Sequence, residues 1–131
     1  MPFPIDEKYI VETEQQLGIE FPESFKRKMC VENGGEFSTE EDDWQLHPFY
    51  DGSDNTRIKR TWASISYETK EARGQDNFPK EAIAIASNGC GDNLVLMPGK
   101  DNQTKLQDDI YLWLHETGET IKIADTIFDL I

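Results

Sequence analysis

The stretch Ala82–Met97, AIAIASNGCGDNLVLM, decides the expected fold because a short polar connection joins two apolar segments. Both segments, Ile83–Ile85 and Leu94–Leu96, consist of uncharged residues, most of them strand formers. Gly89 and Gly91 can take the positive φ that a tight connection requires. The sequence therefore predicts a β-hairpin that lies centrally in a sheet and is covered on at least one face.

The connection of this hairpin also invites two functional interpretations. A phosphate-binding loop leads into a helix and usually ends in Gly-Lys-Ser/Thr, whereas here a strand follows and no lysine stands after the glycines. Cys90 could act as a nucleophile only beside a base, and neither His47 nor His115 lies in a cysteine-hydrolase signature. We therefore interpret the loop as a structural turn, and an enzyme that uses Cys90 or His115 stays a third class of function.

The composition indicates one domain that spans residues 1–131. A chain of this length buries roughly two-thirds of its surface and needs no disulfide or metal for stability. The two cysteines fit neither a disulfide framework nor a zinc site. No apolar run approaches the ~20 residues of a membrane span, and the start MPFPIDEKYI lacks the basic region of a signal peptide. We expect a cytoplasmic protein without a metal or cofactor.

The net charge is the most marked feature of the composition. Lys and Arg number 13 against 26 Asp and Glu, which gives a formal charge of −13. Such a surface repels nucleic acid and anionic membranes and attracts basic partners. Solubility explains the charge equally well, because net charge determines neither the fold nor the partner.

Two helices and a strand are expected before residue 50. A first helix over Asp6–Leu17 would have Asp6 as its N-cap and Gly18 as the residue that ends it. Pro22 suits the first turn of a second helix, which ends at Asn33. Residues 36–43 contain five acids in eight positions and are expected to form a loop. Trp44–Phe49 alternates as a strand does.

Residues 56–73 have the clearest helical period of the chain. Inward positions that step by four, three, four and three are Ile58, Trp62, Ile65, Thr69 and Ala72. Ile110–Leu114 and Thr120–Ala124 are expected to form a second hairpin around the turn HETGE, and Asp125 to cap a short terminal helix. The order predicts an α+β fold, a single domain with a largely antiparallel or mixed sheet of about five strands flanked by helices.

Several of these residues together resemble a known family. Leu17-Gly18, Phe21-Pro22 and Asn33-Gly34-Gly35 are similar to the opening "LG…P…NGG" signature of the SUKH superfamily, the Smi/Knr-type proteins. Trp44, IAIASNGCGD, HETGE and the terminal apolar segment continue the likeness over nearly the whole chain, although Cys90 replaces a small loop residue. The resemblance implies a mixed sheet flanked by helices, no catalytic residues, and structural roles for the signature residues.

The same resemblance implies a function, since many bacterial members neutralise a toxin, often a nuclease. We therefore predict an immunity protein that binds a cognate toxin, expected to be basic, and blocks its active or substrate-binding surface. An acidic protein can occupy a cationic surface and gain fast, steered association. The candidate partner-binding acids, should their loops converge, are Glu40, Glu41, Asp42, Asp43, Asp92, Asp108 and Asp109. Neither nucleic acid nor a membrane is an expected partner.

The alternative is a non-catalytic regulatory module that binds proteins other than toxins. The resemblance implies this alternative, because the same superfamily includes fungal cell-wall regulators. Genomic context separates the two, because a toxin gene beside this one favours immunity. A hub-type scaffold is also expected to carry a long disordered polar tail. The sequence has none, which favours the immunity interpretation.

Overall fold

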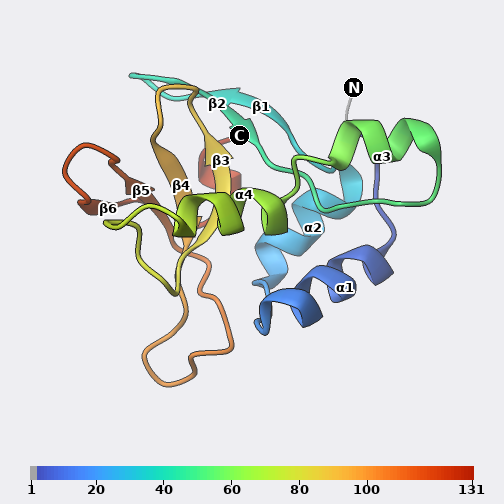
Figure 1. Cartoon of the computed structure of the whole chain (residues 1–131), viewed down its shortest axis with the longest axis horizontal. Coiled ribbons are helices and arrows are strands. Elements are labelled where there is room, and N and C mark those ends of the chain that lie inside the picture. Colours follow the sequence, from blue (N-terminus) through green and yellow to red (C-terminus); the bar gives the residue numbers. More distant parts are fainter. Residues whose placement is uncertain (1–2) are drawn as a thin grey trace.

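The hairpin within Ala82–Met97 forms the middle of the sheet in the computed structural model, which describes residues 3–131 (Figure 1). Strand β3 (Ile83–Ser87) pairs antiparallel with β4 (Asn93–Leu96), so that Ile83 lies opposite Leu96 and Ser87 opposite Asn93. Every residue of β4 is buried, and so is β3 as far as Ala86. The prediction of a central, covered hairpin is confirmed.

A six-stranded antiparallel sheet contains this hairpin in the order β1-β2-β3-β4-β5-β6. The other strands are β1 (Gly35–Ser38), β2 (Asp43–Leu46), β5 (Ile110–Trp113) and β6 (Thr120–Ala124). The fold is α+β as predicted, with one strand more than expected. The prediction of a loop over residues 36–43 is wrong, because β1 continues to Ser38 and β2 begins at Asp43, which leaves only a turn over residues 39–42. An edge strand can carry outward acids, and Phe37 secures β1 by packing against the core.

Helices α1 (Glu7–Leu17) and α2 (Glu23–Val31) begin and end for local chemical reasons. The Asp6 side chain accepts a hydrogen bond from the amide of Lys8, and Gly18 ends α1 with φ 68°. Both caps are as predicted. Pro22 is the N-cap of α2 and not a residue of its first turn.

The prediction of one helix over residues 56–73 is wrong, because the chain forms two helices there. Helix α3 (Asn55–Thr61) ends at Trp62, and α4 (Ile65–Arg73) begins after Ser64, whose side chain accepts a hydrogen bond from the amide of Tyr67. Asp54 caps α3 in the same way through the amide of Arg57. The break turns Trp62 outward, so this side chain is 59% exposed and not part of the core.

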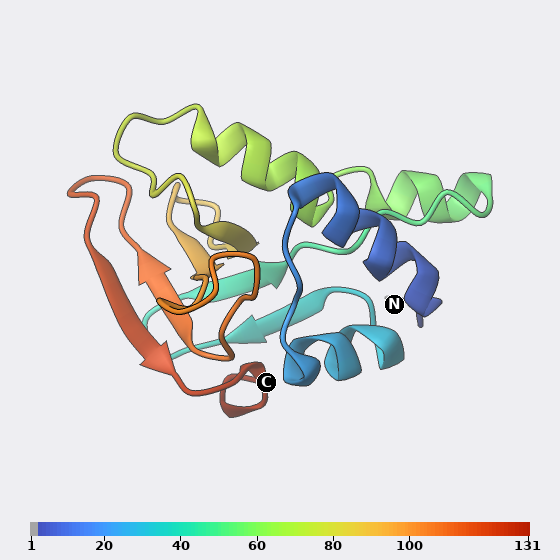
Figure 2. The same ribbon diagram turned by 90° about the horizontal axis from the view of Figure 1, so that it is seen from below.

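The two faces of the sheet carry separate apolar clusters, because successive strand residues point to opposite sides. The larger cluster combines the hairpin with α1 and α2 and includes Ile83, Ile85, Leu94, Leu96, Ile10, Phe25 and Met29. The smaller one joins α4 to the other face through Ala72, Phe78, Ala84, Val95 and Trp113. In Figure 2 α4 lies above the sheet, while α1 and α2 lie to one side.

The chain ends in a 3-10 helix, η1 (Ile127–Asp129), below the sheet in Figure 2. Thr126 caps it through a capping box with Asp129, so the prediction of Asp125 as the cap is wrong. Asp125 instead pairs with Lys122 at 2.9 Å. Within residues 3–131 no helix combines the length and apolar character that crossing a membrane requires.

Candidate functional site

Strand direction divides the predicted partner-binding acids between opposite ends of the sheet. Since neighbouring strands are antiparallel, the turns after β1, β3 and β5 lie at one end, here called the turn end and formed by residues 39–42, 88–92 and 114–119 (Figure 1). Asp92 and the β1–β2 acids, Glu40, Glu41, Asp42 and Asp43, lie at this end. Asp108 and Asp109 precede β5 and lie at the other, so the loops converge only in part.

The acids of the β1–β2 turn differ in how far the protein itself uses them. Asp43 accepts a hydrogen bond from the Ser38 hydroxyl at 2.6 Å across the hairpin. Asp42 shapes the turn through its backbone, which exchanges hydrogen bonds with Thr39. Glu40 and Glu41 are exposed, and no ion pair among residues 3–131 includes either. Their carboxylates are therefore available to a partner.

Asp92 connects two turns of the turn end. Its Oδ1 accepts hydrogen bonds from the backbone amide of His115 at 3.0 Å and from Nδ1 of the same residue at 2.6 Å, and Asn88 donates to Oδ2. Burial raises the pKa of Asp92, but the hydrogen bonds from His115 and Asn88 outweigh it and hold this pKa below its ordinary value. Gly91 permits the close approach, because a Cβ there would lie 3.1 Å from the His115 ring.

At the opposite end, Asp108 and Asp109 hold elements of the fold together. Asp108 accepts a hydrogen bond from the hydroxyl of Ser24 in α2. Asp109 pairs with Lys122 of β6 at 3.1 Å. Both side chains thus contribute internal contacts.

A hollow of about 530 Å³ lies beside the turn Asn33–Gly35 and is here called the groove. The Asn33 side chain forms two hydrogen bonds with the backbone of Phe49, as a neighbouring strand would. Its Nδ2 donates to the Phe49 carbonyl at 2.9 Å, and its Oδ1 accepts from the Phe49 amide at 2.8 Å. Gly34 has φ 110°, which a residue with a Cβ rarely adopts. Lys28 donates to the carbonyls of Glu32 and Gly34, and burial lowers its pKa. The signature residues are structural here.

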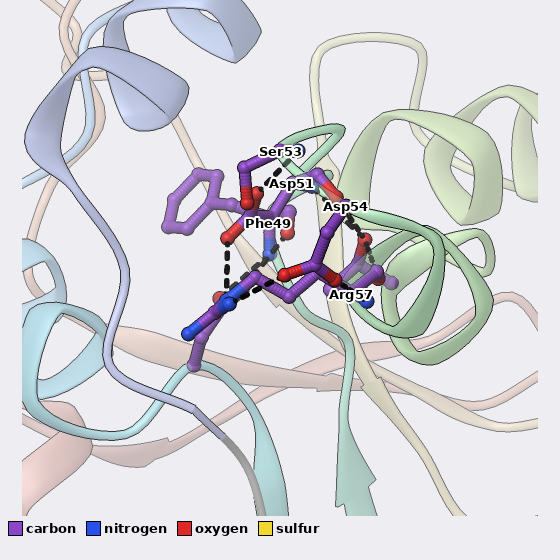
Figure 3. Close-up of polar contacts among 7 residues, drawn as sticks. Phe49, Asp51, Ser53, Asp54 and Arg57 are labelled. Atoms are coloured by element: carbon purple, nitrogen blue, oxygen red, sulfur yellow. Dashed lines mark hydrogen bonds and ion pairs between the residues drawn. The ribbon is translucent and has the colours of Figure 1, made fainter.

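Asp51 and Arg57 line the opposite wall of the groove and belong to a network of paired charges that extends to Asp54 (Figure 3). Arg57 lies 3.4 Å from Asp51 and 2.8 Å from Asp54. Asp51 also accepts a hydrogen bond from the Ser53 amide at 2.9 Å. The hydrogen bond from the backbone amide of Arg57 contributes most to lowering the pKa of Asp54 below its ordinary value. The Arg57 guanidinium stands 4.5 Å from the Phe3 ring centre. Carboxylates and cation thus satisfy one another inside the chain.

The residues considered for catalysis do not form a nucleophile–base pair in the described chain. Cys90 is exposed, and no hydrogen bond among residues 3–131 joins its thiol to His115, whose Nδ1 contacts Asp92. Burial, followed by the negative charges of Glu7 and Asp6, raises the pKa of Cys30 and keeps that thiol protonated. In the same part of the chain no group of three or more His, Cys, Asp or Glu could hold a metal ion.

Sequence reasoning missed one surface group. Trp62 and Tyr67 pack edge to face at 5.5 Å between ring centres, and both are exposed. Glu68 and Glu71 follow on α4 and line a pocket that Asp92 also lines. The signal was Ser64, a good N-cap that marks a new helix start after Trp62.

A sequence model of the SMI1/KNR4 family (SUKH-1) matches residues 4–131, which is essentially the whole chain. The chain belongs to this family. The SUKH resemblance of the opening signature is thereby confirmed. Searches of curated proteins and of solved structures gave no significant match.

Proposed function

We propose that this SUKH-1 protein is a bacterial immunity protein that binds a cognate toxin and blocks its active or substrate-binding surface. The toxin is expected to be a basic, nuclease-type domain, because a nuclease presents cations to phosphate groups. In this proposal the protein acts by covering its partner and catalyses no reaction. Family membership supports the proposal, since it makes a protein partner the expected target.

The observation that carries the electrostatic part is the position of Glu40 and Glu41. Both are exposed at the turn end, and among residues 3–131 no cation pairs with them. The chain as a whole carries a formal charge of −13. Charges of this kind raise the association rate with a cationic surface, and the effect weakens as salt screens them.

The test uses the toxin domain encoded beside this gene. Binding kinetics are measured over a range of salt for the wild type, for Glu40→Gln/Glu41→Gln, and for a matched control, Glu12→Gln/Asp101→Asn, which removes the same charge from exposed sites away from the turn end. We expect the turn-end variant to lower the association rate by about three- to tenfold at low salt, and the control to change it less than twofold.

Two results would contradict the proposal at different levels. Absence of binding, together with no protection of cells that express the toxin, removes the immunity function and leaves the regulatory alternative. Binding with an association rate that is indifferent to salt and to Glu40→Gln/Glu41→Gln removes only the steering by the turn end.

A further inference from the structure

The junction of α3 and α4 exposes two large aromatic side chains side by side. Trp62 is 59% and Tyr67 42% exposed, and their rings contact each other edge to face at 5.5 Å. Two contacts fix the start of α4 beneath the pair. The Ser64 hydroxyl accepts a hydrogen bond from the Tyr67 amide, and Ile65 is fully buried. Rigid, exposed Trp and Tyr side chains are the residues most often found at the energetic centre of a protein interface.

Two acids adjoin this aromatic pair. A side-chain hydrogen bond with Glu71, followed by the negative charge of the same residue, raises the pKa of Tyr67. Glu68 stands one turn before Glu71, and burial followed by the negative charge of Glu71 raises the pKa of Glu68. None of the ion pairs among residues 3–131 includes Glu68 or Glu71.

The two glutamates also form one wall of a pocket between α4 and the β3–β4 turn. Its volume is about 260 Å³, below the roughly 300–1,000 Å³ of small-molecule sites and suited to one side chain. Asp92 and Asn93 lie on its other side, and its lining contains no Lys or Arg.

The basic residues of α4 do not close this surface. At 100° per residue, Lys70 and Arg73 lie on the side of Tyr67 away from Glu68. Arg73 donates to the carbonyl of Ala82, which holds it on that side. The helix therefore separates a cationic stripe from an aromatic and acidic one.

We propose that this aromatic and acidic surface, formed by Trp62, Tyr67, Glu68 and Glu71 and here called the α4 face, docks a basic protein surface through an arginine that enters the pocket. The occupant follows from charge and shape: a guanidinium pairs with carboxylates in a bidentate manner and stacks on aromatic rings, which an ammonium does less well. The inference rests on the proposed function, in which the arginine belongs to the toxin.

The experiment compares toxin binding by Trp62→Ala, by Glu68→Gln/Glu71→Gln and by the matched control Glu12→Gln/Asp101→Asn, after thermal unfolding has verified that each variant is folded. We expect both α4-face variants to weaken the equilibrium affinity at least tenfold, mainly through faster dissociation, and the control to change it less than twofold. A wild type that binds, with both α4-face variants within twofold of it, overturns the α4 face and leaves the immunity function standing.

If the wild type does not bind the toxin domain, the proposed function fails first and a second probe tests the α4 face alone. A hexa-arginine peptide is titrated into isotope-labelled protein, and NMR shifts are followed for the Trp62 indole and the α4 amides. Shifts at the α4 face that Glu68→Gln/Glu71→Gln reduces at least fivefold support the inference. Shifts confined to the turn formed by residues 39–42 overturn it.

Discussion

The groove and the α4 face both contain carboxylates beside an aromatic ring, but in the described chain only those at the groove have a cation. In the groove, Asp51 and Asp54 pair with Arg57, and the guanidinium of this arginine lies over the ring of Phe3. On the α4 face, no cation–π contact among residues 3–131 involves Trp62, and no ion pair there involves Glu68 or Glu71. The carboxylates around Arg57 thus have a cation from within the chain, and Glu68 and Glu71 have none among residues 3–131.

Whether charged groups are already paired distinguishes groups that stabilise the fold from groups that can bind a partner, and it does so more clearly than the volume of the hollow. The groove is the larger hollow, yet Asp51 and Arg57 in its wall already pair with each other, so an anionic ligand would have to displace Arg57 from existing contacts. The α4 face has the smaller hollow but offers groups that gain from a cation. Carboxylates and aromatic rings that lack a cation are thus a better guide to a binding site here than the volume of a hollow.

The largest effect is expected in the groove, from Asn33→Ala. The change leaves the buried amide and carbonyl of Phe49 without the side chain that satisfies them, and we expect a loss of about 3 kcal/mol in the free energy of unfolding. Chemical denaturation measures it, with the exposed Asn55→Ala as a control that stays within about 0.5 kcal/mol of the wild type. A loss below 1 kcal/mol would contradict the structural role of the signature asparagine.

The second effect concerns His47, which leads from β2 into the groove wall. Its Nε2 is buried with no hydrogen-bond partner in the described chain, and burial lowers its pKa to about 4 from 6.5. Between these values the native state binds fewer protons than the unfolded state, so stability must fall as the pH falls. We expect a loss of about 2 kcal/mol from pH 7 to pH 5.

Denaturation at these two pH values measures the difference for the wild type and for His47→Leu. The variant has no imidazole to protonate, so its stability should change by less than about 0.5 kcal/mol over the same window. Equal pH dependence in both proteins would show that other groups control acid stability.

The smallest effect has the opposite sign and comes from Glu68→Gln. It removes the repulsion between Glu68 and Glu71 on one helix face, and we expect a gain of about 0.3 kcal/mol. Asp54→Asn is the matched change in the groove: it keeps an N-cap but loses the ion pair with Arg57, so its melting temperature should fall. Parallel thermal unfolding compares the two, and a fall in both would remove the contrast.

The sequence alone predicted the parts of the fold that local chemistry determines. The β3–β4 and β5–β6 hairpins and the caps at Asp6 and Gly18 follow from the apolar pattern and the turn residues. Strand β1 was missed because it is short, contains the acid Glu36 and runs into an acidic turn, while its pairing with β2 and the packing of Phe37 depend on the assembled fold. The break after α3 was missed because the helical period continues across Trp62–Ser64.

The candidate site was harder to predict, because it depends on strand order. Knowing that the strands run as a simple meander would have placed Asp108 and Asp109 at the end away from Asp92. The α4 face depends on the direction of Trp62, which the continuous period assigned to the core. Whether an acid forms an ion pair depends on residues that are distant in the sequence, so the spacing of residues along the chain does not predict it.

Lys122 has a consequence for how this protein can meet others. It stands in β6, one of the two edge strands of the sheet, and bridges Asp109 and Asp125. A strand laid against β6 would have to strip water from a charged amine held by two carboxylates, which discourages sheet extension between copies or with a guest peptide. These paired charges therefore disfavour growth of the sheet at that margin.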